Sequence, residues 1–457
     1  MPQEMTDELR FFTELTQVPR PSGYQDKIKA YLRKFAGDRG LEFREDAAGN
    51  ILIRRKGNTR TVVLQGHTDI VANSVGEFDF VNTPLRTKIE DGWITAECTT
   101  LGADDGAGLA LILCALSDPS LEGYDIEGLF TYDEEIGLMG AMELDGSMVA
   151  GRMLLNLDNE DVNEITIGSA GSADIEAEFT FPRTEDAGRF YSIGVSGLRG
   201  GHSAGEIGNN RGNAILILTG FLRKFSGVRI ASISGGIAPN VIPMSAVAVF
   251  SIPQGFDAYE AFDGYAEQMH SGLDEPDLTI SLKECGPVPS WSKDDTARFL
   301  DAIAMCPNGV IDTDDYGVRT SSNVGMVTGD TKVIVKPRSS DTERLEELVD
   351  TICAVFRCRK AEAPRPYIFP AWKESEDSRI VRTAVSVYRE HFGRDPKVTV
   401  THGGLESSTI KDKCPGMEAI AIGPTIVGAH TPDERMDIST LTAMKGYVFG
   451  LIRTLAR

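Results

Sequence analysis

The sequence has little that would suit it to a membrane or to nucleic acid. Its 457 residues contain no run of about 18 or more apolar residues, which excludes a membrane-spanning helix. Lys and Arg total 46 against 68 Asp and Glu, a net charge of −22, and no basic cluster interrupts this excess. Because nucleic acids and anionic membrane surfaces are bound by basic faces, we expect neither as a partner. The acidic excess indicates solubility, and it leaves open that some carboxylates cluster to hold cations.

Cysteines are few, odd in number and scattered along the chain. The sequence has seven, and no two of them form a CxxC pair. This pattern argues against a disulfide framework and against a zinc site made of thiolates. The first 15 residues are acidic and amphipathic rather than basic and then apolar, so we expect no secretory signal and a cytoplasmic protein.

The length and the order of apolar segments predict more than one domain. A chain of 457 residues exceeds the roughly 250–300 that one hydrophobic core usually serves. Apolar strands predicted at 61–65, 126–132 and 153–157 are separated by helical segments, and a similar texture returns at 378–455. This alternation predicts an α/β domain with a mainly parallel sheet.

The middle of the chain has a different texture. Segments 173–181 and 246–252 read as strands, and the first alternates as a half-exposed antiparallel strand does. Residues 341–356 predict a strongly amphipathic helix, so this part reads as an α+β domain with helices on one face of an open sheet. We therefore expect an α/β catalytic domain at 1–175 and 365–457, with an α+β domain inserted at 176–364.

A histidine and an aspartate follow directly after the first predicted strand. The motif is Gly66-His67-Thr68-Asp69, and its spacing places His67 and Asp69 on the same side of an extended chain. A metal site needs an imidazole and a nearby carboxylate that binds the metal or orients the ring. A loop histidine beside a capping aspartate would have the same sequence, so this motif alone leaves both interpretations open.

Two adjacent aspartates, Asp104 and Asp105, precede an apolar helix predicted at 106–116. Aspartates in this place commonly cap the helix. The alternative is that Asp104 bridges two metal ions while the helix end tolerates the negative charge.

Acidic residues also follow the other two strands of the predicted parallel sheet. Asp133-Glu134-Glu135 comes after 126–132, and Asp158 comes after 153–157. Like charges this close repel unless solvent or cations compensate, and parallel sheets place their sites at the carboxyl ends of strands. With His430, the set comprises two histidines and at least four carboxylates, which predicts zinc, although manganese or cobalt would also fit. Two such metals would activate water and clamp the reacting carbonyl.

Taken together, the motifs resemble a known family over nearly the whole chain. They are Gly66-His67-Thr68-Asp69, Gly102-Ala103-Asp104-Asp105-Gly106, Asp133-Glu134-Glu135-Ile136-Gly137, Asn156-Leu157-Asp158 and His430, with the turn Pro19-Arg20-Pro21-Ser22 and the segment Gly197-Leu198-Arg199-Gly200-Gly201-His202-Ser203. This ordered set resembles the di-zinc exopeptidases that include aminoacyl-histidine dipeptidases, carnosinases, tripeptidase and aminoacylase. Within that family it is most similar to the bacterial aminoacyl-histidine (Xaa-His) dipeptidases.

The resemblance implies an enzyme that hydrolyses the amide bond of a dipeptide with a metal-bridging hydroxide. The implied ligands of two zinc ions, with Asp104 shared between them, are His67, Asp104, Glu135, Asp158 and His430. Glu134 would be the general base, and Asp69 would support the site. His202 would stabilise the oxyanion in the active site of a partner subunit, which implies a homodimer and makes the inserted domain a lid and dimerisation domain.

The resemblance also suggests residues that contact the substrate. Asn240 and Arg338 would bind its C-terminal carboxylate, His402 would line the pocket, and Glu406 would face its amino group. For each of these a plain structural role is equally open. Asp105, where the aminoacyl-histidine dipeptidases usually carry asparagine, the segment 207–212 and Ser407-Ser408 depart from their pattern and weigh against an Xaa-His substrate.

Two other interpretations remain at this point. One is an N-acyl-amino-acid deacylase or another exopeptidase of the same family. The other is a catalytically silent binding protein on this fold, which predicts a broken ligand set or a missing base. The sequence has both the ligands and the base.

Overall fold

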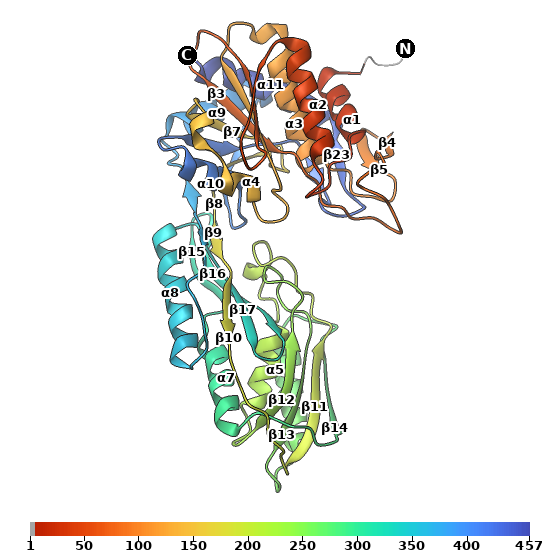
Figure 1. The fold of residues 1–457 in the computed structure, drawn as a ribbon, viewed down its shortest axis with the longest axis vertical. Helices are drawn as coiled ribbons and strands as arrows, with labels where there is room; N and C mark the ends of the chain where they lie inside the picture. Colours follow the sequence, from red (N-terminus) through yellow and green to blue (C-terminus); the bar gives the residue numbers. More distant parts are fainter. Residues whose placement is uncertain (1–4) are drawn as a thin grey trace. The chain divides into compact units, whose positions relative to one another are not determined.

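The computed structural model describes residues 5–457, which form two compact units (Figure 1). The first unit comprises the described residues up to Gly168 together with Trp372–Val400 and Leu405–Arg457. The second comprises Ser169–Ala371 and the short segment Thr401–Gly404. The chain thus passes into the second unit after Gly168, whereas the sequence suggested a boundary at 175, and the domain roles stay predictions.

The first unit is built on a nine-stranded sheet. Its strands, in spatial order, are β1 (Glu42–Glu45), β2 (Ile51–Arg55), β6 (Ile126–Thr131), β3 (Val62–His67), β7 (Met153–Asn156), β21 (Glu418–Ala421), β8 (Glu164–Ser169) and β19 (Trp372–Lys373), with β20 (Lys397–Thr401) also paired to β8.

Parallel pairing is confined to the centre of this sheet. The four neighbouring strands β6, β3, β7 and β21 run parallel. The flanking pairs β1–β2, β2–β6 and β21–β8 are antiparallel. The sheet is therefore mixed, and the expectation of a mainly parallel sheet describes only its central strands.

Helices cover both faces of the central strands. The helices of the first unit are α1 (Asp7–Thr16), α2 (Asp26–Arg39), α3 (Ala103–Ser117), α4 (Met139–Glu143), α9 (Arg379–Phe392), α10 (Glu406–Lys413) and α11 (Ile438–Leu455). On β6, Gly128 packs against Ile112 of α3, while the next residue, Leu129, joins Ala141 of α4 and Ile410 of α10 in a buried cluster. This alternation along a strand gives each face of the sheet its own helical cover.

A small antiparallel sheet completes the first unit. Its strands, in order, are β22 (Ile426–Val427), β23 (Arg435–Asp437), β5 (Trp93–Ala96) and β4 (Thr87–Glu90). The segment between β22 and β23 carries His430 and Glu434, so this sheet fixes the two ends of a loop that the site uses.

The second unit has a ten-stranded sheet in which every described pairing is antiparallel. Its strands are β14 (Thr279–Cys285), β11 (Arg189–Ser196), β13 (Ala246–Ile252), β12 (Arg229–Gly235), β16 (Gly317–Thr328), β17 (Lys332–Ser339), β9 (Gly171–Ala173), β18 (Ile368–Phe369), β10 (Ile175–Glu178) and β15 (Gly309–Asp314).

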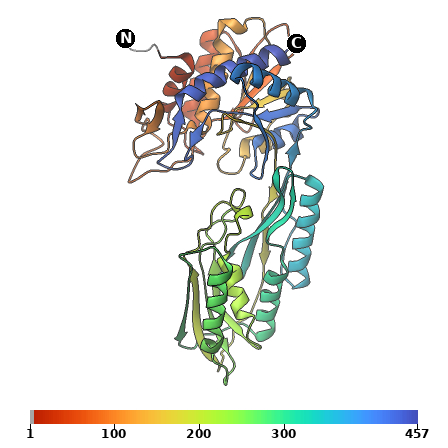
Figure 2. The ribbon, with the colours of Figure 1, turned by 180° about the vertical axis from the view of Figure 1, so that it is seen from behind.

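The helices of the second unit are α5 (Ala214–Leu222), α6 (Ala258–Gly272), α7 (Lys293–Met305) and α8 (Thr342–Cys358). Figure 2 shows α5 and α7 in front of the strands, and both contact β12. They bury a core that includes Phe221, Phe250 and Trp291. Each unit therefore has its own core. Among residues 5–457, no helix is both long enough and apolar enough to cross a membrane.

Candidate metal centre

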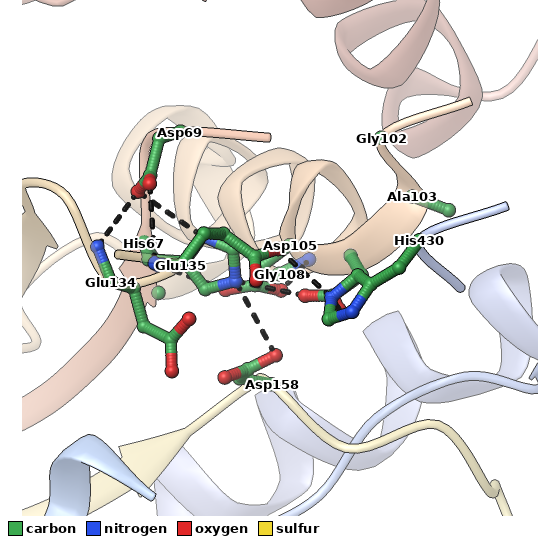
Figure 3. A network of polar contacts seen from close by, with 12 residues as sticks. His67, Asp69, Gly102, Ala103, Asp105, Gly108, Glu134, Glu135, Asp158 and His430 are labelled. Carbon is green, nitrogen blue, oxygen red and sulfur yellow. Dashed lines mark hydrogen bonds and ion pairs between the residues drawn. The ribbon is translucent and has the colours of Figure 1, made fainter. Parts of the chain in front are cut away.

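Three neighbouring strands of the first unit end at one edge of the sheet. The register pairs His67, the last residue of β3, with Thr131, the last residue of β6. It also pairs Gln65 of β3 with Asn156, the last residue of β7. The residues just beyond these ends come together in the cluster that Figure 3 shows, with Asp69, Glu134, Glu135 and Asp158 around His67. This is where parallel strands usually place a functional site.

Asp104 lies between two histidines that are far apart in the sequence. Its Oδ1 is 2.8 Å from Nε2 of His67, and its Oδ2 is 3.1 Å from Nε2 of His430. The backbone of Asp104 and Asp105 departs from helical angles within the first turn of α3. Asp104 therefore extends its carboxylate to both imidazoles instead of capping the helix.

Each histidine has one further carboxylate beside it. Nε2 of His67 lies 3.7 Å from Oδ1 of Asp158, and Nε2 of His430 lies 3.0 Å from Oε1 of Glu135. Ligand atoms of His67, Asp104 and Glu135 all lie within 4.8 Å of one another. The cluster therefore consists of two groups, each with one imidazole and one carboxylate, which share Asp104.

Negative charge in this cluster exceeds what the protein itself neutralises. Burial, and next the charge of Asp104, raise the pKa of Asp158 to about 7 and that of Glu160 to about 7. Hydrogen bonds to Asp104 and Glu135 raise the pKa of His430 to about 11. Carboxylates held this close are stabilised by a bound cation, and imidazole with carboxylate is a donor set that suits zinc. The residues present therefore fit a divalent metal.

The ring of His67 is oriented for a ligand. Nε2 faces the carboxylates of Asp104 and Asp158. Nδ1 is buried, has no hydrogen bond to any residue of 5–457, and lies 3.6 Å from Oδ1 of Asp69. A carboxylate behind an imidazole favours the tautomer that leaves the other nitrogen free to bind a metal. Asp69 therefore lies where a supporting residue for His67 belongs.

Asp69 also holds the turn that carries Glu134 and Glu135. Its Oδ1 accepts the backbone N–H of Glu134 at 3.0 Å, and its Oδ2 accepts that of Glu135 at 3.2 Å. Ser22 donates its hydroxyl to Oδ2 at 2.8 Å. One fully buried side chain thus orients the ring of His67 and fixes two successive acidic residues.

The carboxylate of Glu134 lies beside the cluster without joining either histidine. Figure 3 shows it on the same side of the cluster as Asp158. Burial raises the pKa of Glu134 well above its ordinary value; the charge of His67 opposes this rise, and that of Asp158 adds to it. A carboxyl group that is close to the cluster but outside both groups can accept and return a proton.

Three further buried charged residues form hydrogen bonds with the backbone of the segments around His67 and Asp104. Glu434 accepts the backbone N–H groups of Leu101 and Ala103 at 2.8 and 2.7 Å. Asp105 accepts the backbone N–H groups of His67 at 3.2 Å and Gly108 at 3.0 Å. The third is Arg20. Glu434 lies two residues after Pro432, and Arg20 lies between two prolines. Neither position in the sequence indicates which loop the side chain would contact.

Glu406, expected near the substrate amino group, lies fully buried in the first unit. Its Oε2 accepts hydrogen bonds from Gln65 Nε2 and Thr131 Oγ1, both at 2.6 Å, while Oε1 is buried and accepts none from the residues that the structure describes. Burial raises its pKa to about 8, against the opposing charge of His67. Through Gln65 and Thr131 it contacts the carboxyl ends of β3 and β6. Its role toward the substrate stays a prediction.

The four other candidates, His202, Asn240, Arg338 and His402, belong to the second unit. Ser203 connects two of them, because its backbone N–H donates to the Asn240 carbonyl at 2.8 Å and its hydroxyl lies 3.5 Å from Nε of Arg338. Nε2 of His402 lies 2.7 Å from the hydroxyl of Ser321, which is paired with Arg338 across β16 and β17. His202 directly precedes Ser203 and is exposed.

This second group of residues is cationic and polar. Arg338 is 4% exposed, and burial lowers its pKa to about 10. Burial, with the charge of Arg338, lowers the pKa of His402 to about 4, so the ring is neutral at pH 7. Nδ1 of His402 is buried without a hydrogen bond in the described part of the chain. A buried guanidinium with hydroxyl and imidazole groups beside it suits an anionic ligand.

Comparison with known proteins shows which family the chain resembles. The model of peptidase family M20/M25/M40 matches residues 63–454. The cytosol non-specific dipeptidase of Escherichia coli (strain K12) is 30% identical over 96% of this chain and 95% of its own length.

Solved structures extend the likeness to the fold. The aminoacylhistidine dipeptidase of Vibrio alginolyticus is 31% identical, with a TM-score of 0.85 over 99% of this chain and 97% of that chain. A tripeptidase of Staphylococcus aureus, 19% identical with a TM-score of 0.59 over 99% of this chain and 98% of its own, has a similar fold.

Proposed function

This chain belongs to peptidase family M20/M25/M40, and we propose that it is a metal-dependent dipeptidase that cleaves the amide bond between two amino acids. Two relatives that match nearly the whole chain, one in sequence and one also in structure, carry the name of dipeptidase. One observation supports the proposal most: Asp104 lies between His67 and His430, each with a further carboxylate. A catalytically silent protein on this fold would have no need of that arrangement.

The ligands of two metal ions would be the residues of the two groups. His67 and Asp158 would hold one ion, Glu135 and His430 the other, and Asp104 would contribute one oxygen to each. Zinc fits this donor set best, and manganese or cobalt are the alternatives. When bound, the two ions would activate the attacking water and polarise the substrate carbonyl.

Glu134 would perform the proton transfers of the reaction. Its carboxylate would accept a proton from the water that attacks the peptide carbon. When the carbon–nitrogen bond breaks, it would return that proton to the leaving amine nitrogen. Asp69 assists because it holds the backbone N–H of Glu134 at 3.0 Å and keeps the carboxylate at a fixed place beside the ligands.

The second unit would recognise the rest of the substrate. Arg338 and Asn240 would bind its C-terminal carboxylate, supported by the buried guanidinium, and His402 would line the same place. Glu406 would act toward the amino end. His202 would stabilise the oxyanion in the active site of a second copy, so the active form would be a homodimer. The name of the Escherichia coli relative supports a cytoplasmic location.

A panel of substrates tests this proposal. Metal-free protein is loaded with zinc and assayed on β-alanyl-histidine, several Xaa-His peptides, dipeptides without histidine, and N-acetylated amino acids, each with and without a chelator. We expect hydrolysis of dipeptides with a free amino group that a chelator abolishes and zinc restores. Cleavage of the N-acetylated amino acids alone would make the chain a deacylase. The absence of any cleavage by zinc-loaded protein would contradict the proposal.

A further inference from the structure

Arg20 is a buried cation in a segment that carries no metal-ligand candidate. It lies in the Pro19–Ser22 turn between α1 and α2 and is only 2% exposed. Its Nη1 donates to the backbone carbonyls of Thr68 and Asp69, both at 3.0 Å, and its Nη2 donates to the carbonyl of Gly102 at 2.7 Å. One guanidinium therefore joins the segment after His67 to the segment before Asp104.

Backbone carbonyls satisfy the guanidinium of Arg20. It donates hydrogen bonds to the carbonyls of Thr68, Asp69 and Gly102. Burial lowers its pKa, and the charges of Asp105, Asp69 and Glu434 oppose that shift. Because burying a charge is costly unless hydrogen bonds satisfy it, the three backbone carbonyls are what hold the guanidinium in place.

The packing around the guanidinium is close. A Cβ atom at Gly106 would lie 2.6 Å from Nη2 of Arg20, and one at Gly102 would lie 3.2 Å from it. Gly102 also has a positive φ of 67°, which favours glycine. The start of α3 therefore has glycine at the two positions that leave room for this side chain.

The segment before Asp104 is also held by a buried carboxylate, which binds its backbone N–H groups. The carboxylate of Glu434 accepts the N–H groups of Leu101, Gly102 and Ala103 at 2.8, 3.0 and 2.7 Å. Glu434 lies four residues after His430, so it also connects this segment to the loop with the second histidine. Arg20 binds the carbonyl side of the segment and Glu434 its N–H side, and the two leave Asp104 little freedom.

We propose that Arg20 is a positioning residue that sets the separation of His67 and Asp104, and thereby the affinity of the centre for metal. This inference rests on the proposed function, because it concerns the same metal centre. Arg20 donates to backbone carbonyls of the segments around His67 and Asp104, and it acts through the fixed fork of its guanidinium. A lysine keeps a charge but offers one ammonium in place of the planar fork that reaches two segments at once.

Zinc titration of metal-free protein tests the proposal. The variants are Arg20→Met, Arg20→Lys and the control Arg55→Met, each titrated against a chromophoric chelator of known affinity. Arg55 is a suitable control because it lies in the same unit and also donates to backbone carbonyls, those of Ala115 and Asp118, at the far end of α3. We expect both Arg20 variants to bind zinc about ten- to a hundredfold more weakly, as is common for residues behind metal ligands, and the control to match the wild type.

Amide hydrogen exchange of the metal-free proteins shows which segments become less well held in the Arg20 variants. In Arg20→Lys we expect faster amide exchange than in the wild type within 66–70 and 101–105 only, with the second unit unchanged. Arg20→Lys keeps the buried charge, so it serves if Arg20→Met does not fold. Wild-type zinc affinity in either folded variant would overturn the proposal for Arg20. If the wild-type protein itself binds no zinc, the proposed function fails. The titration therefore distinguishes a failure of the Arg20 proposal from a failure of the proposed function.

Discussion

The two polar clusters of this molecule are opposite in charge. In the first unit, three carboxylates, those of Asp104, Glu135 and Asp158, lie beside two imidazoles. In the second unit, a buried guanidinium lies near a neutral imidazole and hydroxyl groups. The first cluster would therefore suit cations and the second an anion, as the proposed dipeptidase requires of its metal centre and of a site for a carboxylate.

The clusters also differ in how their side chains are held. Those of the first unit lie at strand ends, at the start of α3 or on loops, and buried charges such as Arg20 and Glu434 hold these segments through their backbone groups. Arg338 and Ser321 of the second unit lie within paired strands, so the sheet register itself sets their positions. Substitutions in the first unit should therefore change metal binding and turnover, and those in the second should change substrate affinity.

The largest expected effect is that of Glu134→Gln. Because the amide cannot accept the proton of the attacking water, we expect kcat to fall by about 10²–10⁴-fold while bound zinc per chain stays unchanged. Steady-state kinetics and metal analysis of the same samples measure this. Glu143→Gln, at an exposed glutamate at the end of α4, is the control and should behave as the wild type. Wild-type turnover in Glu134→Gln would exclude the general-base role.

Asp104→Asn should weaken metal binding more than any substitution behind the ligands. One oxygen of Asp104 faces each histidine, so the amide removes one of the two donor oxygens and the negative charge. We expect zinc affinity to fall by at least about a hundredfold at both positions, above the usual effect of residues that only support ligands. Asp118→Asn, at the other end of α3, is the control. Loss of a single zinc ion would show that Asp104 is not shared.

In the second unit, Arg338→Met should leave zinc binding intact and raise KM. A hydrogen bond to a charged group contributes about 1.5–3 kcal/mol, which corresponds to roughly a ten- to hundredfold weaker affinity for a substrate carboxylate. Kinetics on a dipeptide and on the same dipeptide with an amidated C-terminus measure this. The variant should lose the preference for the free carboxylate, whereas Arg344→Met, on the exposed side of α8, should keep it. An unchanged preference in Arg338→Met would exclude the guanidinium from carboxylate binding.

The smallest expected effect concerns stability in acid. Because the folded protein holds the pKa of His402 down at about 4, the unfolded chain binds more protons between that value and the ordinary 6.5. Stability from this residue is therefore present above about pH 6.5 and is lost as the pH falls toward 4. We expect the melting temperature of His402→Gln to fall less steeply than that of the wild type across this range. Parallel profiles would mean that the ring is not buried as a neutral group.

The sequence predicted the central strands of the sheet, whose carboxyl ends carry candidate site residues. The apolar run at 61–65 corresponds to β3, which continues to His67, and the runs at 126–132 and 153–157 correspond to β6 and β7. Apolar periodicity could not reveal β16, because this strand buries polar residues, among them Ser321, Ser322 and Asn323. The short strands of the small sheet that carries the His430 loop were missed because they are too short to show a period.

Prediction from the sequence was also limited for the candidate site. Residues with metal-binding side chains could be selected by type and by their place after strands, and His67, Asp104, Glu135 and His430 do lie together. Residues that act through backbone groups, such as Arg20 and Glu434, could not, because their partners lie 82 and 331 residues away along the chain. Asp105, which differs from the usual asparagine of the aminoacyl-histidine dipeptidases, accepts the backbone N–H groups of His67 and Gly108, and its place near the substrate stays a prediction.

The most direct test of the shared metal centre is a crystal structure of the zinc-loaded protein with anomalous data collected at the zinc edge. We expect two anomalous peaks on either side of Asp104, one beside His67 and Asp158 and the other beside Glu135 and His430. A single peak, or two peaks of which only one contacts Asp104, would contradict the shared centre on which the proposed dipeptidase mechanism depends.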